Sequence, residues 1–394
     1  MSAPVFDPSG LEPKSATDEQ RAQAPVARTP DGTWVVLGHQ EALAVTGDDT
    51  SYSADVSRFL QVPNGLDGAE HAAFREALDP FFSPERMEQA EPVVRGVAAE
   101  LVAELLAGVG PAGIEVDAVA AFGAVFAVRA QTAWLGWPSP LEPQLLAWMV
   151  DKHDASRSGE LARTAEVAER LDALIRSVLD PRRALGDDAP EDVTTELTRV
   201  RVSLPDPEVP GSTTRALRDE EIVSVLRNWT GGDLSSLALC VGVLLMALAR
   251  DPLLAERVRV GSDAETAAII DELLRIDDPF VSNRRVTTCP VTLAGQRIGA
   301  GERVLIHWTS VNRDERVFAN PDRFDPEGHA EHNLVYGTGA HGCPGRPLAT
   351  LELVVALQEL LRVAQVSPAE TAGEREIAPT GGWAHAPVVL TPRR

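Results

Sequence analysis

Cysteine is scarce in this sequence of 394 residues, which contains only Cys240, Cys289 and Cys343. An odd number without regular spacing does not build the disulfide framework of a secreted domain, and it indicates a reducing compartment. The N-terminal residues 1–24 also lack the apolar core of a signal peptide and any run of roughly 20 apolar residues that could span a membrane. We therefore expect a cytoplasmic protein with an irregular segment at residues 1–24 and no membrane attachment.

The sequence also has few positively charged residues and no recognisable linker. The chain has 36 Lys and Arg against 59 Asp and Glu, a formal net charge of −23. Nucleic acids and anionic membranes are bound through a basic stripe, which this sequence lacks, so we expect no nucleic-acid partner. No Pro/Ser-rich linker divides the chain, and its 44% hydrophobic residues can fill a large core. The sequence predicts a single domain over residues 1–394.

The most informative segment is the glycine-rich stretch 336–349, in which Cys343 directly precedes an apolar helical pattern. Glycines such as Gly337 and Gly345 let backbone N–H groups approach the sulfur, and a helix N-terminus favours an anion. This combination is typical of a thiolate that ligates a haem iron. Two other interpretations exist: a buried structural cysteine, or half of a zinc site with His341, for which no second ligand pair is present.

The segment resembles the haem-binding loop of the cytochrome P450 family, whose pattern is Phe-Gly-x-Gly-x-His-x-Cys-x-Gly followed by a helix. The chain departs from it only where Tyr336 stands for Phe, and such a ring still packs under the macrocycle if its hydroxyl finds a partner. The resemblance implies haem b (iron protoporphyrin IX) ligated by Cys343. It also implies a mainly α fold with small β-sheets, in which the haem is buried between a long central helix and the Cys-ligand loop.

The run 219–250 has helical apolar periodicity and predicts that central helix, with a length of about 50 Å. Gly231 and Gly232 lie inside it, where each costs about 1 kcal/mol relative to Ala. Glycines in such a place indicate a kink, a bulge, close helix packing or a ligand against the backbone.

The same resemblance places Ala/Gly-Gly-x-Asp/Glu-Thr in the central helix, where the acid and the alcohol organise proton delivery during O2 activation. Asp233 matches the acid. Leu234 stands where Thr is expected and has no donor or acceptor. We expect Asp233 to supply protons through Ser235 or an ordered water.

The resemblance further assigns cations to the two haem propionates, which need partners if they are partly buried. The predicted propionate partners are His71, Arg75, Arg285 and His341. Glu272 and Arg275 lie one turn apart on a predicted helix at 265–276. In the family such a pair holds the loop before the haem together with an Arg that matches Arg323.

The implied reaction inserts one oxygen atom of O2 into an organic substrate, as hydroxylation, epoxidation or dealkylation, while the other atom leaves as water. The chain shows no flavin or iron–sulfur segment, so we expect a ferredoxin or flavodoxin with an NAD(P)H-dependent reductase to dock near Arg346. An apolar or partly aromatic small molecule is the expected substrate. By resemblance its pocket would contain seven residues that could equally be ordinary core: Phe59, Leu60, Asn228, Trp229, Phe280, Val281 and Trp383.

Because Leu234 replaces the alcohol, two other enzyme types remain open: a peroxide-driven peroxygenase and an oxidative-coupling enzyme of the same fold. A non-catalytic, haem-free binding member is a third alternative. The retained Cys343 and the propionate cations argue against that third alternative, because a protein without haem has no physical need for them.

Overall fold

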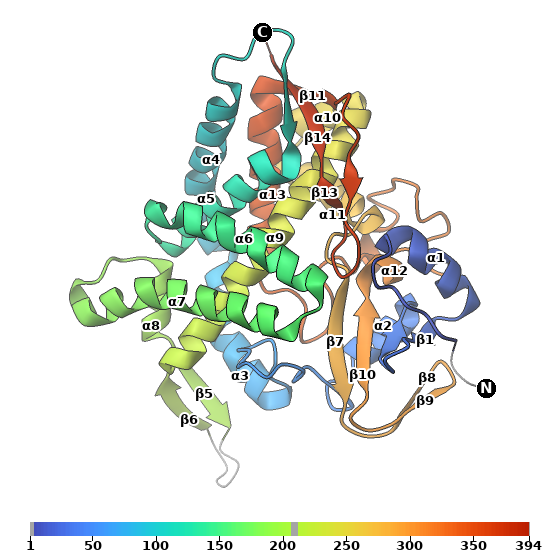
Figure 1. Cartoon of the computed structure of the whole chain (residues 1–394). Helices are drawn as coiled ribbons and strands as arrows, with labels where there is room; N and C mark the ends of the chain where they lie inside the picture. The colour runs from blue at the N-terminus through green and yellow to red at the C-terminus, as the bar shows by residue number, and fades with distance from the viewer. Residues whose placement is uncertain (1–3, 206–211, 394) are drawn as a thin grey trace.

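The computed structural model describes residues 4–205 and 212–393. It is mainly helical with small sheets, as predicted (Figure 1). The helices are α1 (Pro13–Gln23), α2 (His39–Thr46), α3 (Gly68–Leu78), α4 (Pro84–Leu106), α5 (Ala124–Leu135), α6 (Glu142–Ser158), α7 (Leu161–Leu185), α8 (Val193–Arg199), α9 (Asp219–Arg250), α10 (Pro252–Val260), α11 (Asp263–Ile276), α12 (Trp308–Val311) and α13 (Arg346–Val363).

The strands form five sheets within the described residues. A five-stranded sheet has the order β1-β2-β10-β7-β3, a three-stranded sheet has the order β11-β14-β4, and three hairpins pair β5 with β6, β8 with β9 and β12 with β13. The strands are β1 (Val26–Arg28), β2 (Trp34–Val36), β3 (Tyr52–Ser53), β4 (Ile114–Asp117), β5 (Arg201–Pro205), β6 (Ser212–Ala216), β7 (Ser282–Thr287), β8 (Val291–Leu293), β9 (Gln296–Ile298), β10 (Arg303–His307), β11 (Ala364–Pro368), β12 (Glu374–Arg375), β13 (Trp383–His385) and β14 (Pro387–Pro392).

Helix α9 has the predicted bounds and runs through the helical part of the molecule behind α6 and α7 (Figure 1). The helix is continuous through both of its central glycines. A Cβ at Gly231 would make ordinary contacts 3.6 Å from Leu171 and Trp148, whereas a Cβ at Gly232 would meet open space. Helix packing therefore requires a glycine at neither position, and Gly232 borders a cavity.

Two helical segments among the described residues are long and apolar enough to cross a membrane: α9 and the stretch Ala118–Leu135. Their windows are 72% and 61% buried inside the protein. Because they pack against other helices of the same chain, we interpret them as core helices.

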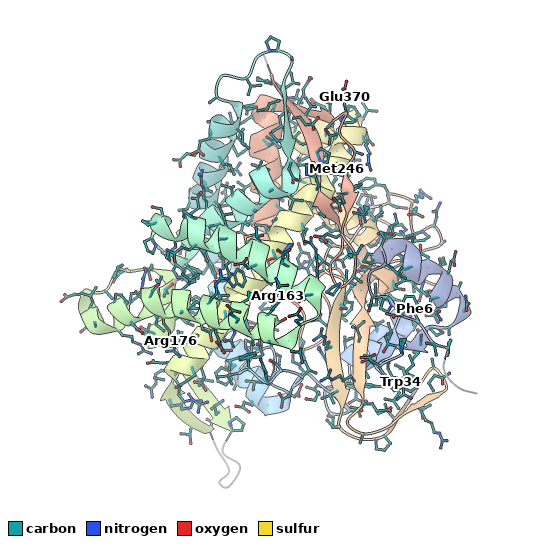
Figure 2. The ribbon with its side chains drawn as sticks, in the orientation of Figure 1. Phe6, Trp34, Arg163, Arg176, Met246 and Glu370 are labelled. Atoms are coloured by element: carbon teal, nitrogen blue, oxygen red, sulfur yellow. The ribbon has the colours of Figure 1, made fainter. Side chains whose placement is uncertain are left out.

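The five-stranded sheet has small cores of its own beside the main helical core. Figure 2 shows Trp34 and Phe6 in this part of the molecule, away from Arg163 and Arg176 on α7. Strand β10 pairs parallel with β2 and antiparallel with β7, which carries Arg285. The sheet thus holds one predicted site residue in a fixed register.

The prediction of an irregular segment at residues 1–24 was wrong, because α1 occupies residues 13–23. Glu12 caps this helix by accepting hydrogen bonds from the N–H groups of Lys14 and Ser15, and Pro13 occupies the first helical position. Proline loses nothing there, because its missing N–H would have no partner inside the helix. The capping residues therefore favour a helix here, although the polar composition of the segment suggested irregular structure.

The predicted ion pair on α11 is present and buried. Arg275 donates to both carboxylate oxygens of Glu272, at 2.8 and 3.0 Å. The prediction that Arg323 completes it was wrong, because its side chain is 69% exposed and lies 3.6 Å from Asp325. The third partner is His329, whose Nδ1 lies 2.8 Å from Glu272 Oε1.

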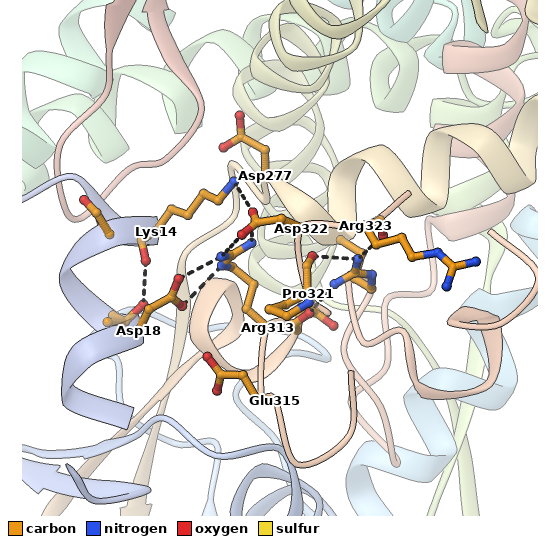
Figure 3. A network of polar contacts seen from close by, with 12 residues as sticks. Lys14, Asp18, Asp277, Arg313, Glu315, Pro321, Asp322 and Arg323 are labelled. Atoms are coloured by element: carbon orange, nitrogen blue, oxygen red, sulfur yellow. Dashed lines mark hydrogen bonds and ion pairs between the residues drawn. The ribbon is translucent and has the colours of Figure 1, made fainter. Parts of the chain in front are cut away.

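The backbone around Arg323 is nevertheless part of the same network. Arg275 donates to the carbonyl of Pro321 at 2.9 Å, and Figure 3 shows the Arg323 side chain pointing away from these contacts. Next to it, Arg313 bridges Asp18 of α1 and Asp322. Buried arginines therefore hold the loop that precedes the Cys343 segment, because they donate hydrogen bonds to its carbonyl and carboxylate oxygens.

The start of α9 generates a stability prediction. Glu221 is buried, and burial opposes its ionisation, but hydrogen bonds from Arg215 and Arg218 lower its pKa to about 2. A carboxyl with a lowered folded-state pKa stabilises the fold above its unfolded-state pKa and loses that contribution as pH falls through the folded-state pKa.

We expect Glu221→Gln to lower the free energy of unfolding at pH 7 by roughly 1.5–3 kcal/mol. The deficit should shrink as pH falls from about 4.5 toward 2. Urea denaturation of wild type and variant across this range measures it, with the exposed neighbour change Glu220→Gln as control. A deficit that does not depend on pH would contradict the ionic role.

Candidate functional site

Cys343 opens onto a cavity in the interior of the protein, so its exposure is to the cavity and not to the outer surface. The cavity contains about 1550 Å³ of empty space, part of it open to solvent. Its walls come from α3, α5, α9, α11, β7, the loop before α13 and α13 itself. Segments that are far apart in sequence therefore meet around one cysteine.

The loop before α13 is shaped by glycine. Gly337 and Gly339 have φ of +67° and +72°, and a Cβ at Gly339 would lie only 2.5 Å from the carbonyl oxygen of Thr46. The Cys343 N–H donates to the Tyr336 carbonyl at 2.9 Å. Side chains at these glycines would strain the turn or collide with α2, so the turn depends on them.

The sulfur lies at the N-terminus of α13, as predicted. Burial raises the pKa of the Cys343 thiol, and the backbone N–H groups of Gly345 and Arg346 act in the opposite direction. Tyr336 lines the cavity, its hydroxyl lies 3.5 Å from Thr350 Oγ1, and Arg346 stacks over its ring at 5.1 Å. The polar tip of Tyr336 thus has a partner.

Two arginines approach the loop from different elements. Arg75 of α3 donates to the carbonyls of Ala340 and Gly342 at 2.9 and 3.1 Å, and it pairs with Asp79 at 2.6 Å. Arg285 of β7 is 8% exposed, and its only side-chain hydrogen bond among the described residues goes to the carbonyl of Arg284. Burial lowers the pKa of Arg285, the charge of Asp67 acts in the opposite direction, and no ion pair to Arg285 occurs among the described residues.

The two predicted histidines stack on each other beside these arginines, with ring centroids of His71 and His341 4.1 Å apart. Burial and then Arg75 lower the pKa of His71, while burial, His71 and Arg285 lower that of His341 to about 4. His341 Nε2 lies 3.5 Å from Asp67 without hydrogen-bond geometry. All four predicted propionate partners therefore line one cavity. Among the described residues, Arg285 has no carboxylate partner and His341 Nε2 accepts or donates no hydrogen bond.

Helix α9 presents a different face to the cavity than the sequence suggested. Gly232, Asp233 and Ser236 line it, whereas Leu234 is buried in the core. Ser235, the predicted relay, points elsewhere: its hydroxyl lies 3.3 Å from Lys152 Nζ of α6. Ser235 and Asp233 are two residues apart on one continuous helix, so they project from nearly opposite faces.

A second carboxyl, Glu352 of α13, accompanies Asp233. Neither Glu352 oxygen nor Asp233 Oδ2 has a hydrogen-bond partner within the described part of the chain. Burial raises the pKa of Asp233 to about 7, and burial together with Asp233 raises that of Glu352 well above its usual range. The pair thus holds protons near neutral pH.

The predicted substrate pocket is only partly assembled here. Asn228, Trp229 and Phe280 line the cavity, while Phe59, Leu60, Val281 and Trp383 do not. Leu60 is exposed and its carbonyl accepts from Ser224, and Trp383 is held under Arg375 and Arg250. These four residues therefore do not contribute to the cavity wall, although Phe280, the neighbour of Val281, does.

Sequence reasoning missed several lining residues, namely Phe82, Gln131, Trp134, Ser236, Leu237 and Asn283. Trp134 and Phe82 stack at 5.5 Å, and both rings contact Trp229. For Ser236 a signal was available, because it lies three residues after Asp233 and shares its helical face. The residues of α5 carried no such signal.

Comparison with known proteins agrees with this geometry. A model of the family described as Cytochrome P450 matches residues 266–391. The erythromycin C-12 hydroxylase of Saccharopolyspora erythraea is 28% identical over 356 residues, which cover 86% of this chain and 84% of the relative. A solved structure of a P450 EryK mutant in complex with erythromycin B has a TM-score of 0.81 and 26% identity, with 96% of each chain covered. The chain belongs to the cytochrome P450 family.

Further relatives of this P450 include the cyclomarin C epoxidase CymV of Salinispora arenicola, 27% identical with 83% of this chain and 82% of the relative covered. The mycinamicin IV hydroxylase/epoxidase of Micromonospora griseorubida is 29% identical, with 91% and 90% covered. The P450 is accordingly an oxidoreductase, a haem-thiolate monooxygenase that acts on a small molecule and receives electrons from redox partners.

The residues of the P450 cavity fit a haem. A buried arginine without a carboxylate and a histidine nitrogen without a hydrogen bond suit the two propionates, and Cys343 faces the same space. No group of three or more His, Cys, Asp or Glu that could hold a metal ion occurs in the described residues. The donor set is therefore that of a single thiolate with surrounding cations.

We expect Arg285→Gln to release haem at least several-fold faster than the wild-type P450, because it removes a buried cation that faces the propionates. The neighbouring change Arg284→Gln is the matched control, since Arg284 is exposed on the same strand. Transfer of haem to apomyoglobin measures the rate. Equal rates for both variants would contradict the assignment of Arg285.

Proposed function

We propose that this P450 oxidises an apolar or partly aromatic small molecule by hydroxylation or epoxidation, as a single cytoplasmic haem-thiolate domain. The observation that carries the proposal is one cavity that combines Cys343, the cations for haem propionates and an acid on α9. Aromatic and aliphatic side chains form much of the remaining wall, including Phe82, Trp134, Trp229, Leu237 and Phe280. The names of the relatives, which are hydroxylases and epoxidases, support the reaction type.

The roles of the residues follow from their positions. Cys343 would bind the haem iron through its thiolate, and Arg75, Arg285, His71 and His341 would hold the propionates. When bound, the haem supplies the redox centre at which O2 is activated. The overall reaction consumes O2, two electrons and two protons, and releases the oxidised substrate and one water.

Asp233 is the proton-holding group of this proposal. It lines the cavity, its pKa of about 7 lets it exchange protons near neutral pH, and Glu352 forms a second proton-holding carboxyl. Ser235 is not part of the route, because its hydroxyl faces Lys152. Leu234 adds no polar group, so the chain must complete the route with other donors.

Electrons come, in our proposal, from a ferredoxin or flavodoxin with its NAD(P)H-dependent reductase, docked on the Cys343 side. Arg346 is 58% exposed there, although it also donates to Asp271 Oδ2 at 2.8 Å. That internal pair reduces the charge available to an acidic partner, so other contacts must contribute to docking.

Turnover with two oxidant systems tests the proposal. A panel of apolar aromatic and polycyclic compounds is first screened for a substrate-induced shift of the haem Soret band. With NAD(P)H, reductase and ferredoxin, we expect a product one oxygen atom heavier, whose yield is unchanged by catalase. Product formed with hydrogen peroxide alone, and none with NAD(P)H, would instead establish the peroxygenase that the absent alcohol at Leu234 favours.

A further inference from the structure

Trp134 of α5 lines two separate spaces in the protein. One is the cavity that fits the haem. The other, the outer hollow, lies between α4, α5 and α8, and its wall includes the exposed residues Gln89, Val93 and Glu196. Among the described residues that line these two spaces, Trp134 alone belongs to both. One indole ring therefore reaches from the haem cavity to the surface of the protein.

The Trp134 ring is held in this position by other aromatic rings. Its centroid lies 5.5 Å from that of Phe82 and 5.4 Å from that of Trp229. The side chain is 8% exposed, and the rings of Phe82 and Trp229 are themselves 5.2 Å apart. Moving one of three rings in mutual contact would open a void in a close-packed interior. The packing therefore favours a fixed ring over a door between the two spaces.

A fixed indole ring between a haem cavity and the surface can carry electrons. The ring can lose one electron to a strong oxidant and recover it from a reductant, and a haem treated with peroxide supplies such oxidising power. Trp229, Trp308 and Tyr336 also line the cavity, but none of them lines the outer hollow. A radical formed on Trp229 would reach the surface through its neighbour Trp134. Trp134 is thus the ring that a reductant outside the cavity can meet.

The wall of the outer hollow suits a neutral aromatic reductant. It carries two arginines and three carboxylates, among which Arg86 and Glu196 pair with each other. Asp192 is held by Arg182 of α7 at 2.6 Å. Val93, which is 47% exposed, adds apolar surface. Because the opposite charges nearly cancel, a charged reductant gains little here, whereas a phenol offers an apolar ring with a polar tip.

We propose that Trp134 is a surface oxidation site, at which this P450 oxidises phenols too large for the cavity with hydrogen peroxide as the oxidant. Each peroxide takes up two electrons and two protons, its O–O bond breaks, and two waters form. The electrons come one at a time from the Trp134 ring, which each time takes one back from a phenol in the outer hollow. Each phenol also releases its O–H proton to solvent and becomes a phenoxyl radical, so two phenols are consumed per peroxide. The activity requires the haem but not the proposed oxidation of a small molecule in the cavity.

The first experiment locates the radical and needs no phenol. The holoenzyme is treated with hydrogen peroxide and the spin trap nitroso-tert-butane, and its peptides are sequenced by tandem mass spectrometry. We expect an adduct on Trp134 that depends on peroxide. Trp137 is the internal control, because it lines neither space and its N–H donates to Thr194 at 2.9 Å. Adducts on Trp229 or Tyr336 with none on Trp134 would overturn the proposal.

The second experiment measures peroxide-dependent oxidation of a phenol coupled to dextran, which cannot enter the cavity. Trp134→Phe should lower this rate roughly tenfold or more, because a phenylalanine ring is much harder to oxidise, while oxidation of free phenol should fall less. Trp134→Tyr should restore part of the rate, since a tyrosine also gives up an electron. Trp137→Phe is the matched control and should leave the rate unchanged. Equal rates for the wild type and Trp134→Phe would contradict the assignment.

Two further measurements separate this role from others. If Trp134 instead closed a passage for small molecules, Trp134→Phe would speed the binding of carbon monoxide to the reduced haem in flash photolysis and leave the oxidation of dextran-coupled phenol unchanged, which would refute a surface oxidation site. The carbon monoxide spectrum shows whether each variant keeps its thiolate site, and if Trp134→Phe loses it, Trp134→Tyr and the wild-type adduct still decide. Absence of product with NAD(P)H would defeat the proposed function alone, because these experiments use peroxide.

Discussion

Stabilising a sulfur anion inside an apolar interior is the constraint on which the rest of this structure depends. The anion requires N–H groups without side chains in the way, so the loop contains Gly337 and Gly339 in conformations that other residues avoid. It also requires the N-terminus of a helix, which α13 supplies directly after Gly345. Glu272, Arg275 and His329 fix the chain before that loop, so an ion pair far from the chemistry positions the ligand.

The same constraint explains how charge is distributed in the cavity. Arg75, Arg285 and two neutral histidines gather on one side, and Arg285 remains unpaired with any carboxylate among the described residues. Asp233 and Glu352 form a separate group with raised pKa values. If these groups neutralised each other, neither a propionate nor a proton would have a place. Their separation keeps both functions available.

Local patterns made part of this arrangement predictable. The haem loop, the bounds of α9 and the spacing of His71 and Arg75 each depend on residues close together in sequence, and the structure places them as expected. Arg323 was misassigned because its residue type fits the family pattern, while only the folded loop brings His329 to Glu272.

Other features of the site depend on contacts between segments far apart in sequence, which local sequence patterns do not predict. The Ser235 hydroxyl contacts Lys152 of α6. The Trp383 ring packs against Arg250 and Arg375 and does not line the cavity. Gln131 has no motif around it, and its place on the cavity wall appears only in the folded structure. The departure of Leu234 from the family pattern was visible in the sequence, but the placement of Ser236 on the cavity wall was visible only in the structure.

The central claim is that Cys343 binds haem iron as a thiolate. The most direct test is the absorption spectrum of the purified protein after reduction with dithionite and exposure to carbon monoxide, beside the variant Cys343→Ser. The account predicts a strongly red-shifted Soret band in the wild type that is absent from the variant. A wild-type spectrum without haem, or with the Soret band of a histidine-ligated or protonated-thiol haem, would contradict it.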